Sequence, residues 1–164
     1  MNRIYQILGV SLLLCLLSNC STGGNLDSAA QRRTKIESSD VFKIEVAVYG
    51  YLLRKTFWAE SQFSAIFLKG NDAEVDAVTR QFPNHVPPIK TSDRVQLSTG
   101  RSPIDKDTGK PAMLLAAIAS EPAADQAEAL GTTYAGPSVT TTYFFQLKKT
   151  LGSWAIASVH AGNR

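Results

Sequence analysis

The first long apolar segment covers residues 41–58, and its spacing fits a helix better than a strand. Apolar and polar residues alternate from Phe42 to Val48 as they would in a strand, but two neighbouring apolar stripes also recur at helical spacing along the whole segment. Eighteen residues is long for a strand. The pattern therefore predicts a helix, with Ser39 or Asp40 as its N-cap.

Three shorter elements are expected next along the chain. Residues 63–68 form an apolar run that is typical of a short buried strand. Residues 71–74, Asn-Asp-Ala-Glu, resemble a capping box and predict a second, short helix that Pro83 closes. The proline-rich stretch 84–90 is expected to be extended and to lead into a strand around residues 94–98.

The last third of the chain has the pattern of an antiparallel meander. Turn-forming residues separate four runs that predict strands, at residues 112–120, 126–134, 140–149 and 154–160. On the third run, strict alternation places Tyr143, Phe145 and Leu147 on the core face and Phe144 on the opposite face.

Trp154 opens the fourth run and is expected to be a core residue. Alternation places Ile156 and Ser158 on the same face. If Trp154 is buried, its replacement by alanine should cost about 3 to 5 kcal/mol of stability.

Together these elements predict an α+β domain over residues 40–164, in which one long and one short helix pack on a curved antiparallel sheet of about four to six strands. Hydrophobic residues make up 44% of the chain and charged residues 19%, which argues against wholesale disorder.

The N-terminal residues 1–20 have the features of an export signal. An uncharged apolar run covers residues 7–17, too short for the roughly 20 residues that a membrane span needs. Leu17-Ser18-Asn19-Cys20 resembles a bacterial lipobox, which implies that Cys20 carries lipid, palmitate among the acyl chains, and becomes the new N-terminus. The alternative is an ordinary signal peptide, cleaved near Asn19 or later, with Cys20 incidental.

Cysteine usage favours the lipid anchor. Cys15 and Cys20 are the two cysteines, and both belong to the leader, so Cys20 has no disulfide partner in the domain that follows. The expected location is therefore the bacterial cell envelope, with the membrane as a partner through the N-terminal lipid. Because Ser21 and Thr22 follow the cysteine where an Asp would signal inner-membrane retention, the outer membrane facing the periplasm is favoured for a Gram-negative cell. The inner membrane and the cell surface are the alternatives.

Residues 21–39 are rich in Ser, Thr, Gly, Asn and charged residues, and we expect them to form a flexible polar tether. Their short basic cluster, residues 31–35, is better explained as a solvated spacer than as a docking site. The other charges are scattered along the chain, so nucleic-acid binding is not expected.

A resemblance to known proteins rests on short motifs at residues 48–54, 88–92, 105–109 and 143, and on Gly152-x-Trp154. This combination resembles a group of small exported bacterial proteins of unknown function, over about residues 41–160. The closing hairpin is also similar to the last strands of nuclear-transport-factor-like and cystatin-like folds, which implies helices lying on a curved antiparallel sheet.

Candidate chemistry is sparse. Asp105 to Gly109 starts like a calcium loop, but Ala116 stands where the bidentate Glu is required, which favours a turn. The two histidines, His85 and His160, cannot make a zinc site without carboxylates. We therefore expect no cofactor, no metal and no catalytic residue. A ligand pocket, if there is one, would draw on four candidates, although core positions explain most of them better: Trp58, Tyr143, Trp154 and His160.

Two functions remain open. The first is a noncatalytic membrane-anchored envelope lipoprotein that binds another protein. The second is a cone-shaped pocket domain that binds or transforms a small apolar ligand.

Overall fold

The computed structural model describes residues 24–56 and 62–162, and it confirms the predicted α+β class. The helices are α1 (Gly24–Ser38), α2 (Asp40–Lys55) and α3 (Asp72–Gln81), with a 3₁₀ turn at Ser92–Arg94. The strands are β1 (Ile66–Leu68), β2 (Ile89–Thr91), β3 (Val95–Gln96), β4 (Ile104–Asp105), β5 (Met113–Ala119), β6 (Gln126–Gly136), β7 (Val139–Thr150) and β8 (Ser153–Gly162).

Helix α2 is the predicted long helix, and Ser39 is its N-cap. The Phe42 amide donates to the Ser39 hydroxyl at 3.1 Å, which satisfies one of the amides that the first turn leaves free. The helix ends at Lys55, where the backbone and hydroxyl of the C-cap Thr56 both donate to the carbonyls of Leu52 and Leu53.

Six strands form one sheet in the order β2-β1-β5-β6-β7-β8. The meander β5-β6-β7-β8 is antiparallel, as predicted, but β1 pairs in parallel with both β2 and β5, so the sheet is mixed. The parallel pair arises because α3 carries the chain from β1 back to β2, a crossover that a tight turn cannot make.

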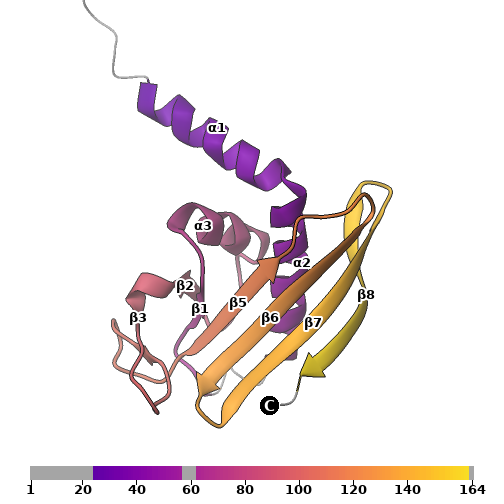
Figure 1. Ribbon diagram of the computed structural model, residues 1–164. Helices are drawn as coiled ribbons and strands as arrows, with labels where there is room; N and C mark the ends of the chain where they lie inside the picture. Colours follow the sequence, from indigo (N-terminus) through magenta and orange to yellow (C-terminus); the bar gives the residue numbers. More distant parts are fainter. Residues whose placement is uncertain (1–23, 57–61, 163–164) are drawn as a thin grey trace, which may run out of the picture. The chain divides into compact units, whose positions relative to one another are not determined.

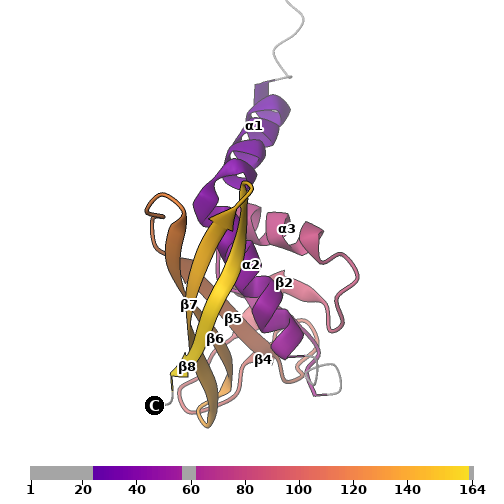
Figure 2. The same cartoon turned by 90° about the vertical axis from the view of Figure 1, so that its right-hand side faces the viewer.

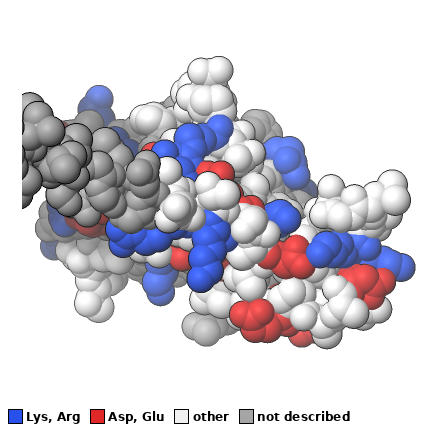
Figure 3. Space-filling view, turned by 90° about the horizontal axis from the view of Figure 1, so that it is seen from above, with Lys and Arg blue, Asp and Glu red and all other residues white. Residues whose placement is uncertain are grey.

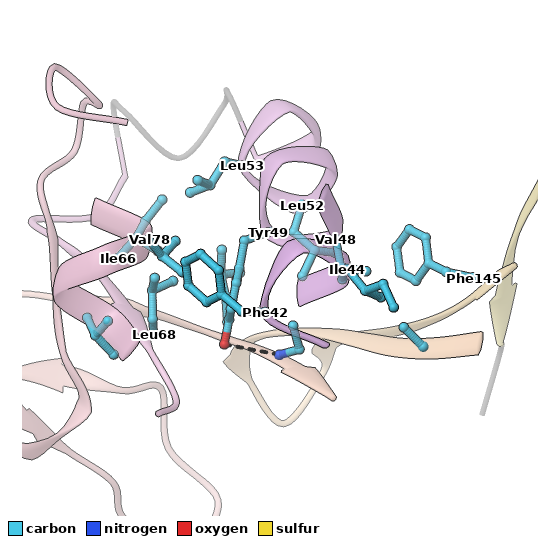
Figure 4. Packing of buried hydrophobic residues seen from close by; sticks show 14 of the residues in the cluster. Phe42, Ile44, Val48, Tyr49, Leu52, Leu53, Ile66, Leu68, Val78 and Phe145 are labelled. Carbon is cyan, nitrogen blue, oxygen red and sulfur yellow. Dashed lines mark hydrogen bonds between the residues drawn. The ribbon is translucent and has the colours of Figure 1, made fainter. Parts of the chain in front are cut away.

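The main core lies between α2, α3 and one face of this sheet, which we call the inner face. Ile44, Val48 and Leu52 of α2 have no exposed surface, and Figure 4 shows them beside Phe145 of β7. Gly131 of β6 lets the helix approach this closely, because a Cβ there would lie 2.8 Å from the Phe145 ring and 3.0 Å from Val48. Figures 1 and 2 show α2 along this one side of the sheet.

The opposite, outer face of the sheet is covered only in part. Ala65, Phe67 and Ala112 form a second small apolar cluster with Val95 of β3. Because Phe67 lies between two inner-face residues of β1, this cluster belongs to the outer face. The β3–β4 hairpin thus covers the outer face beside β1, and the outer face of β6, β7 and β8 carries no other described element (Figure 1).

Strand β8 confirms one of the predictions made for it and corrects another. Trp154 is 8% exposed and belongs to the main core, as expected. Ser158, however, does not share its face. Leu147 pairs with Ile156 and Gln146 with Ser158, so Ala157 is an extra residue, a β-bulge. The bulge reverses the alternation, and Val159 packs on the core while Ser158 donates to Gln146 on the outer face.

The expected flexible tether at residues 21–39 is corrected in its local structure, because most of it forms helix α1. The segment lacks the apolar stripe that would mark a packed helix, yet most of residues 29–37 are Ala, Gln, Arg, Lys or Glu, which favour helix. The boundary between the two units of the chain falls within α1, between Arg32 and Arg33.

Helix α3 begins with the predicted capping box. The Glu74 amide donates to the Asn71 side chain at 3.1 Å, and the Asn71 amide donates to Glu74 at 3.2 Å. Arg33 pairs with Asp76 at 2.7 Å, and Arg80 joins Asp76 to Glu37. Basic and acidic side chains are interspersed on the surface seen in Figure 3, which gives no single-sign patch there.

None of the described helices is both long enough and apolar enough to cross a membrane.

Candidate functional site

The open part of the outer face carries one row of side chains, contributed by four adjacent strands at the same level. Leu130 pairs with Ile118 on one side and with Phe144 on the other, and Phe144 pairs in turn with His160. The strand register alone therefore aligns them. We call these four residues the outer row: Ile118, Leu130, Phe144 and His160.

The apolar members of the outer row are unusually exposed for their size. Ile118 is 59% exposed, Phe144 51% and Leu130 40%. They line a shallow trough of about 450 Å³ whose floor and rim also include Glu128 and Gln146. Large apolar side chains that are exposed together, rather than singly, mark interaction surfaces in soluble proteins.

Polar, mostly uncharged side chains border the outer row on both sides. Thr132 and Thr142 face each other at 3.5 Å between their hydroxyl oxygens on one side. Gln146 accepts a hydrogen bond from the Ser158 hydroxyl at 2.9 Å on the other. Next to this border a second hollow of about 510 Å³, lined by Gln126 and Lys148 among others, is more polar. The site is thus an apolar band inside a hydrogen-bonding frame.

Phe144 leans across β8 rather than standing free. A Cβ placed on Gly162 would lie 2.7 Å from the Phe144 ring, so the ring covers the glycine backbone. An aromatic ring resting on a strand glycine is a known way of stabilising such a residue in a sheet. The ring nevertheless leaves half of its surface to solvent, which keeps the outer row available for contacts.

Two of the predicted pocket candidates lie on the inner face instead. Tyr143 stacks edge-on against Tyr51 of α2 at 5.8 Å between ring centroids, and Tyr51 meets Phe145 in the same way at 5.2 Å. Such aromatic pairs are typical of a packed core. The two candidates therefore serve the interface between α2 and the sheet: Tyr143 and Trp154.

Trp154 is held beside an ion pair at the start of α2. Lys149 donates to Asp40 at 2.6 Å and lies 5.7 Å from the Trp154 ring centroid. The hydrogen bond from Lys149, followed by the nearby indole N–H, lowers the pKa of the Asp40 carboxyl below its ordinary value. The indole N–H itself reaches hydrogen-bonding geometry with no described residue.

The structure does not place the other predicted site residues beside Tyr143 and Trp154. His160 lies on the outer face, so the structure does not bring it together with Tyr143 or Trp154. Trp58 and Cys20 lie outside the described residues. Sequence reasoning missed Ile118, Leu130 and Phe144 as site residues. Leu130 and Phe144 did offer a usable signal, because each is an apolar residue where alternation on its strand expects a polar one. Ile118 offered none, because every residue of β5 is apolar.

Reactive groups do not converge in the part of the chain that the structure describes. There, no three or more His, Cys, Asp and Glu side chains form a group that could hold a metal ion. The Nδ1 atom of His85 lies 2.9 Å from the Pro87 carbonyl oxygen within its own loop.

The loop with alternating acids is a structural clamp. Asp105 is fully buried and accepts hydrogen bonds from Lys90 at 3.0 Å and from the Thr108 hydroxyl at 3.0 Å. The Gly109 amide closes the turn on the Asp105 carbonyl at 2.8 Å, as the turn interpretation predicts. Lys90 also contacts Asp107 at 3.1 Å.

Charge in this clamp is balanced by contacts on every side. Burial alone would raise the pKa of Asp105, but the hydrogen bonds from Lys90, the Asp107 amide and Thr108 outweigh it and lower the pKa below its ordinary value. Asp105 in turn raises the pKa of Lys90. The clamp therefore joins β2 to the β3–β4 hairpin and has little free bonding capacity for a ligand.

The chain matches no protein-family model, no curated protein and no solved structure. Its function is therefore inferred from the chemistry of the site itself.

Proposed function

We propose that this chain is a noncatalytic envelope lipoprotein, anchored through Cys20, whose domain binds another protein through the outer row. The observation that carries the proposal is the alignment of exposed Ile118, Leu130 and Phe144 across neighbouring strands. Protein interfaces combine such an apolar centre, often aromatic, with a polar rim. The threonine and glutamine borders of the outer row supply a rim of this kind.

A small apolar ligand is the second candidate, and the trough volume of about 450 Å³ favours it, because ligand sites usually measure about 300 to 1,000 Å³. Ligand pockets also enclose most of their ligand, however, and this trough is shallow. The hollow found between α2 and the inner face, lined by Tyr49 and Glu45, measures only about 80 Å³. A pocket inside a cone of helices and sheet is therefore less well supported than a protein interface.

The interface can be tested with a photo-crosslinking amino acid placed at Phe144 in the full chain in intact cells. A matched probe at Val139, which is 52% exposed but outside the outer row, reports nonspecific adducts. We expect a protein adduct from position 144 only, and we expect Ile118→Asp to abolish it. Equal adducts from both positions, or an adduct that survives Ile118→Asp, would contradict the proposal. An apolar small molecule that copurifies and is lost in Ile118→Asp would favour the second candidate.

The anchor needs a separate test. Cys20→Ser should leave the domain folded but move it from the membrane fraction to soluble or unprocessed material, because the thiol that accepts the lipid is gone. Labelling with a fatty-acid analogue measures this directly. Unchanged lipid incorporation in the variant would rule out Cys20 as the attachment site, and recovery in the inner membrane alone would contradict an outer-membrane location.

A further inference from the structure

The edges of the six-stranded sheet are protected to different degrees. A strand at an edge presents unpaired backbone N–H and C=O groups that can pair with another chain, and natural proteins shield such edges. At one edge, β2 has only three residues and follows Pro87 and Pro88. Its Lys90 adds a charge, held by Asp105 and Asp107. This edge is short, charged and preceded by residues that cannot donate a backbone hydrogen bond.

A second edge arises where β1 ends beside β5, and side chains of α2 cover it. The Lys69 amide makes the last bond of β1 to β5, to the Leu115 carbonyl at 2.9 Å. Beyond this point the Ala117 amide donates to the Tyr49 hydroxyl at 3.2 Å, the contact drawn in Figure 4. Glu45, one turn earlier on α2, faces the Ala119 amide. Side chains of α2 thus take the place of a neighbouring strand beside the part of β5 that extends past β1.

The edge formed by β8 has neither kind of protection among the described residues. It is ten residues long, and its sequence SWAIASVHAG contains no Asp, Glu, Lys, Arg or Pro. The hydrogen bonds found for its backbone are those of the ladder with β7. Figure 2 looks onto this side of the sheet, with β8 in front. Its one irregularity, the bulge at Ala157, leaves a regularly paired stretch on either side.

We infer that β8 pairs with β8 of a second copy of this chain, antiparallel, about a two-fold axis perpendicular to the sheet. An uncharged strand favours self-pairing, since a residue on the two-fold axis meets its own copy and any charge there would face a like charge. Pairing of β8 with the β2 edge would instead build an open filament, and the short, charged β2 edge disfavours it. The β8 edge therefore closes a dimer.

This arrangement goes beyond the binding role proposed for the outer row and does not depend on it. A two-fold axis perpendicular to the sheet keeps both outer faces on the same side. Because His160 is on β8, the His160 end of each outer row would then lie nearest to the pair of β8 strands. The two outer rows would thus approach each other on one face of the combined sheet. A partner that contacts one outer row would meet a second one next to it.

The test measures the mass of the detergent-solubilised full chain by light scattering over a range of concentrations. We expect a dimer that dissociates on dilution, with β8 amides that are protected from hydrogen exchange in the dimer and lose protection in the monomer. Ala155→Glu and Ala161→Glu place a charge on either side of the bulge, and we expect at least one of them to abolish the dimer. Leu151→Glu, in the adjoining fully exposed turn, is the matched control and should remain dimeric.

Three outcomes would overturn the inference. They are a wild type that is monomeric at all concentrations, dimers that persist in both β8 variants, and β8 amides whose hydrogen-exchange rates do not depend on protein concentration. Circular dichroism checks that each variant is folded, and the hydrogen-exchange measurement on the wild type needs no variant at all. Phe144→Ser changes the outer row but not the β8 edge, so we expect this variant to remain dimeric. The dimer and the binding role of the outer row can therefore be tested independently.

Discussion

Phe144 and Phe145 are neighbours on β7, yet one is 51% exposed and the other 1% exposed. Phe145 packs under α2 beside Tyr51, whereas Phe144 rests on the backbone of Gly162 in the open outer row. The two faces of the sheet therefore use the same residue type for different purposes. Apolar residues on the inner face hold the fold together, and those on the outer face are free to serve an interface.

The largest expected effect separates these two rings directly. Phe145→Ala should lower the free energy of unfolding by about 3 to 5 kcal/mol, because it empties a packed site. Phe144→Ala should change it by at most about 0.5 to 1 kcal/mol, as for most exposed positions. Denaturant unfolding of both variants measures the difference. Equal losses would mean that the outer row is part of the core.

The covered half of the outer face depends on the Asp105 clamp. Lys90→Met leaves the buried Asp105 carboxylate without its cation and should cost about 2 to 3 kcal/mol, somewhat less than for a fully buried pair because Lys90 is partly exposed. The lowered pKa of Asp105 adds a pH dependence. Its stabilisation is present above the ordinary carboxyl pKa of 3.8 and is lost as the pH falls below it. Melting temperatures of wild type and Asp105→Asn across acid pH should converge, and parallel curves would contradict this.

Glycines on the two faces offer a finer comparison. Gly131→Ala drives a methyl group into Phe145, Val48 and Leu52 on the inner face and should cost about 1 to 3 kcal/mol. Gly162→Ala meets the Phe144 ring at a similar distance, but that ring is exposed and can rotate away. We expect the Gly162 variant to lose less stability in thermal melts, and the reverse order would refute the assignment of faces.

The smallest effect concerns the edge that α2 caps. Tyr49→Phe removes the hydroxyl that joins the Ala117 amide to the Lys69 carbonyl and should cost about 1 to 2 kcal/mol. Burial raises the pKa of Tyr49 from 10.0 to about 12, so the phenol keeps its proton, and both hydrogen bonds, even above pH 10. Hydrogen exchange should accelerate at Ala117 and stay unchanged at the amides of β7. Uniform acceleration would indicate general destabilisation instead.

Elements with local signals were predictable from the sequence. The cap at Ser39, the capping box at Asn71 and the alternation around Phe145 each depend on residues a few positions apart. Helix α1 was missed because it lacks an apolar stripe, and the bulge at Ala157 because an added residue leaves no distinct composition. The parallel end of the sheet depends on pairing between β1 and β5, which are distant in sequence.

Only part of the candidate site could be predicted from the sequence. Alternation on a single strand places Phe144 on the outer face, and the sequence indicates His160 as a candidate. That Ile118 and Leu130 lie level with them depends on the registers of three strand pairs, which turn lengths and the bulge fix together. The lipid anchor, the envelope location and the resemblances to exported bacterial proteins and to cystatin-like folds stay predictions.

The extra residue at Ala157 has a consequence for how this surface could have arisen. Without Ala157 the ladder between β7 and β8 would be regular, and Val159 and His160 would keep their faces, because each still pairs with the same residue of β7. The bulge thus accommodates the extra residue without moving the side chains that follow it. A single codon inserted or deleted at this point therefore leaves the outer row unchanged, and related chains could differ here by one gap while keeping His160 opposite Phe144.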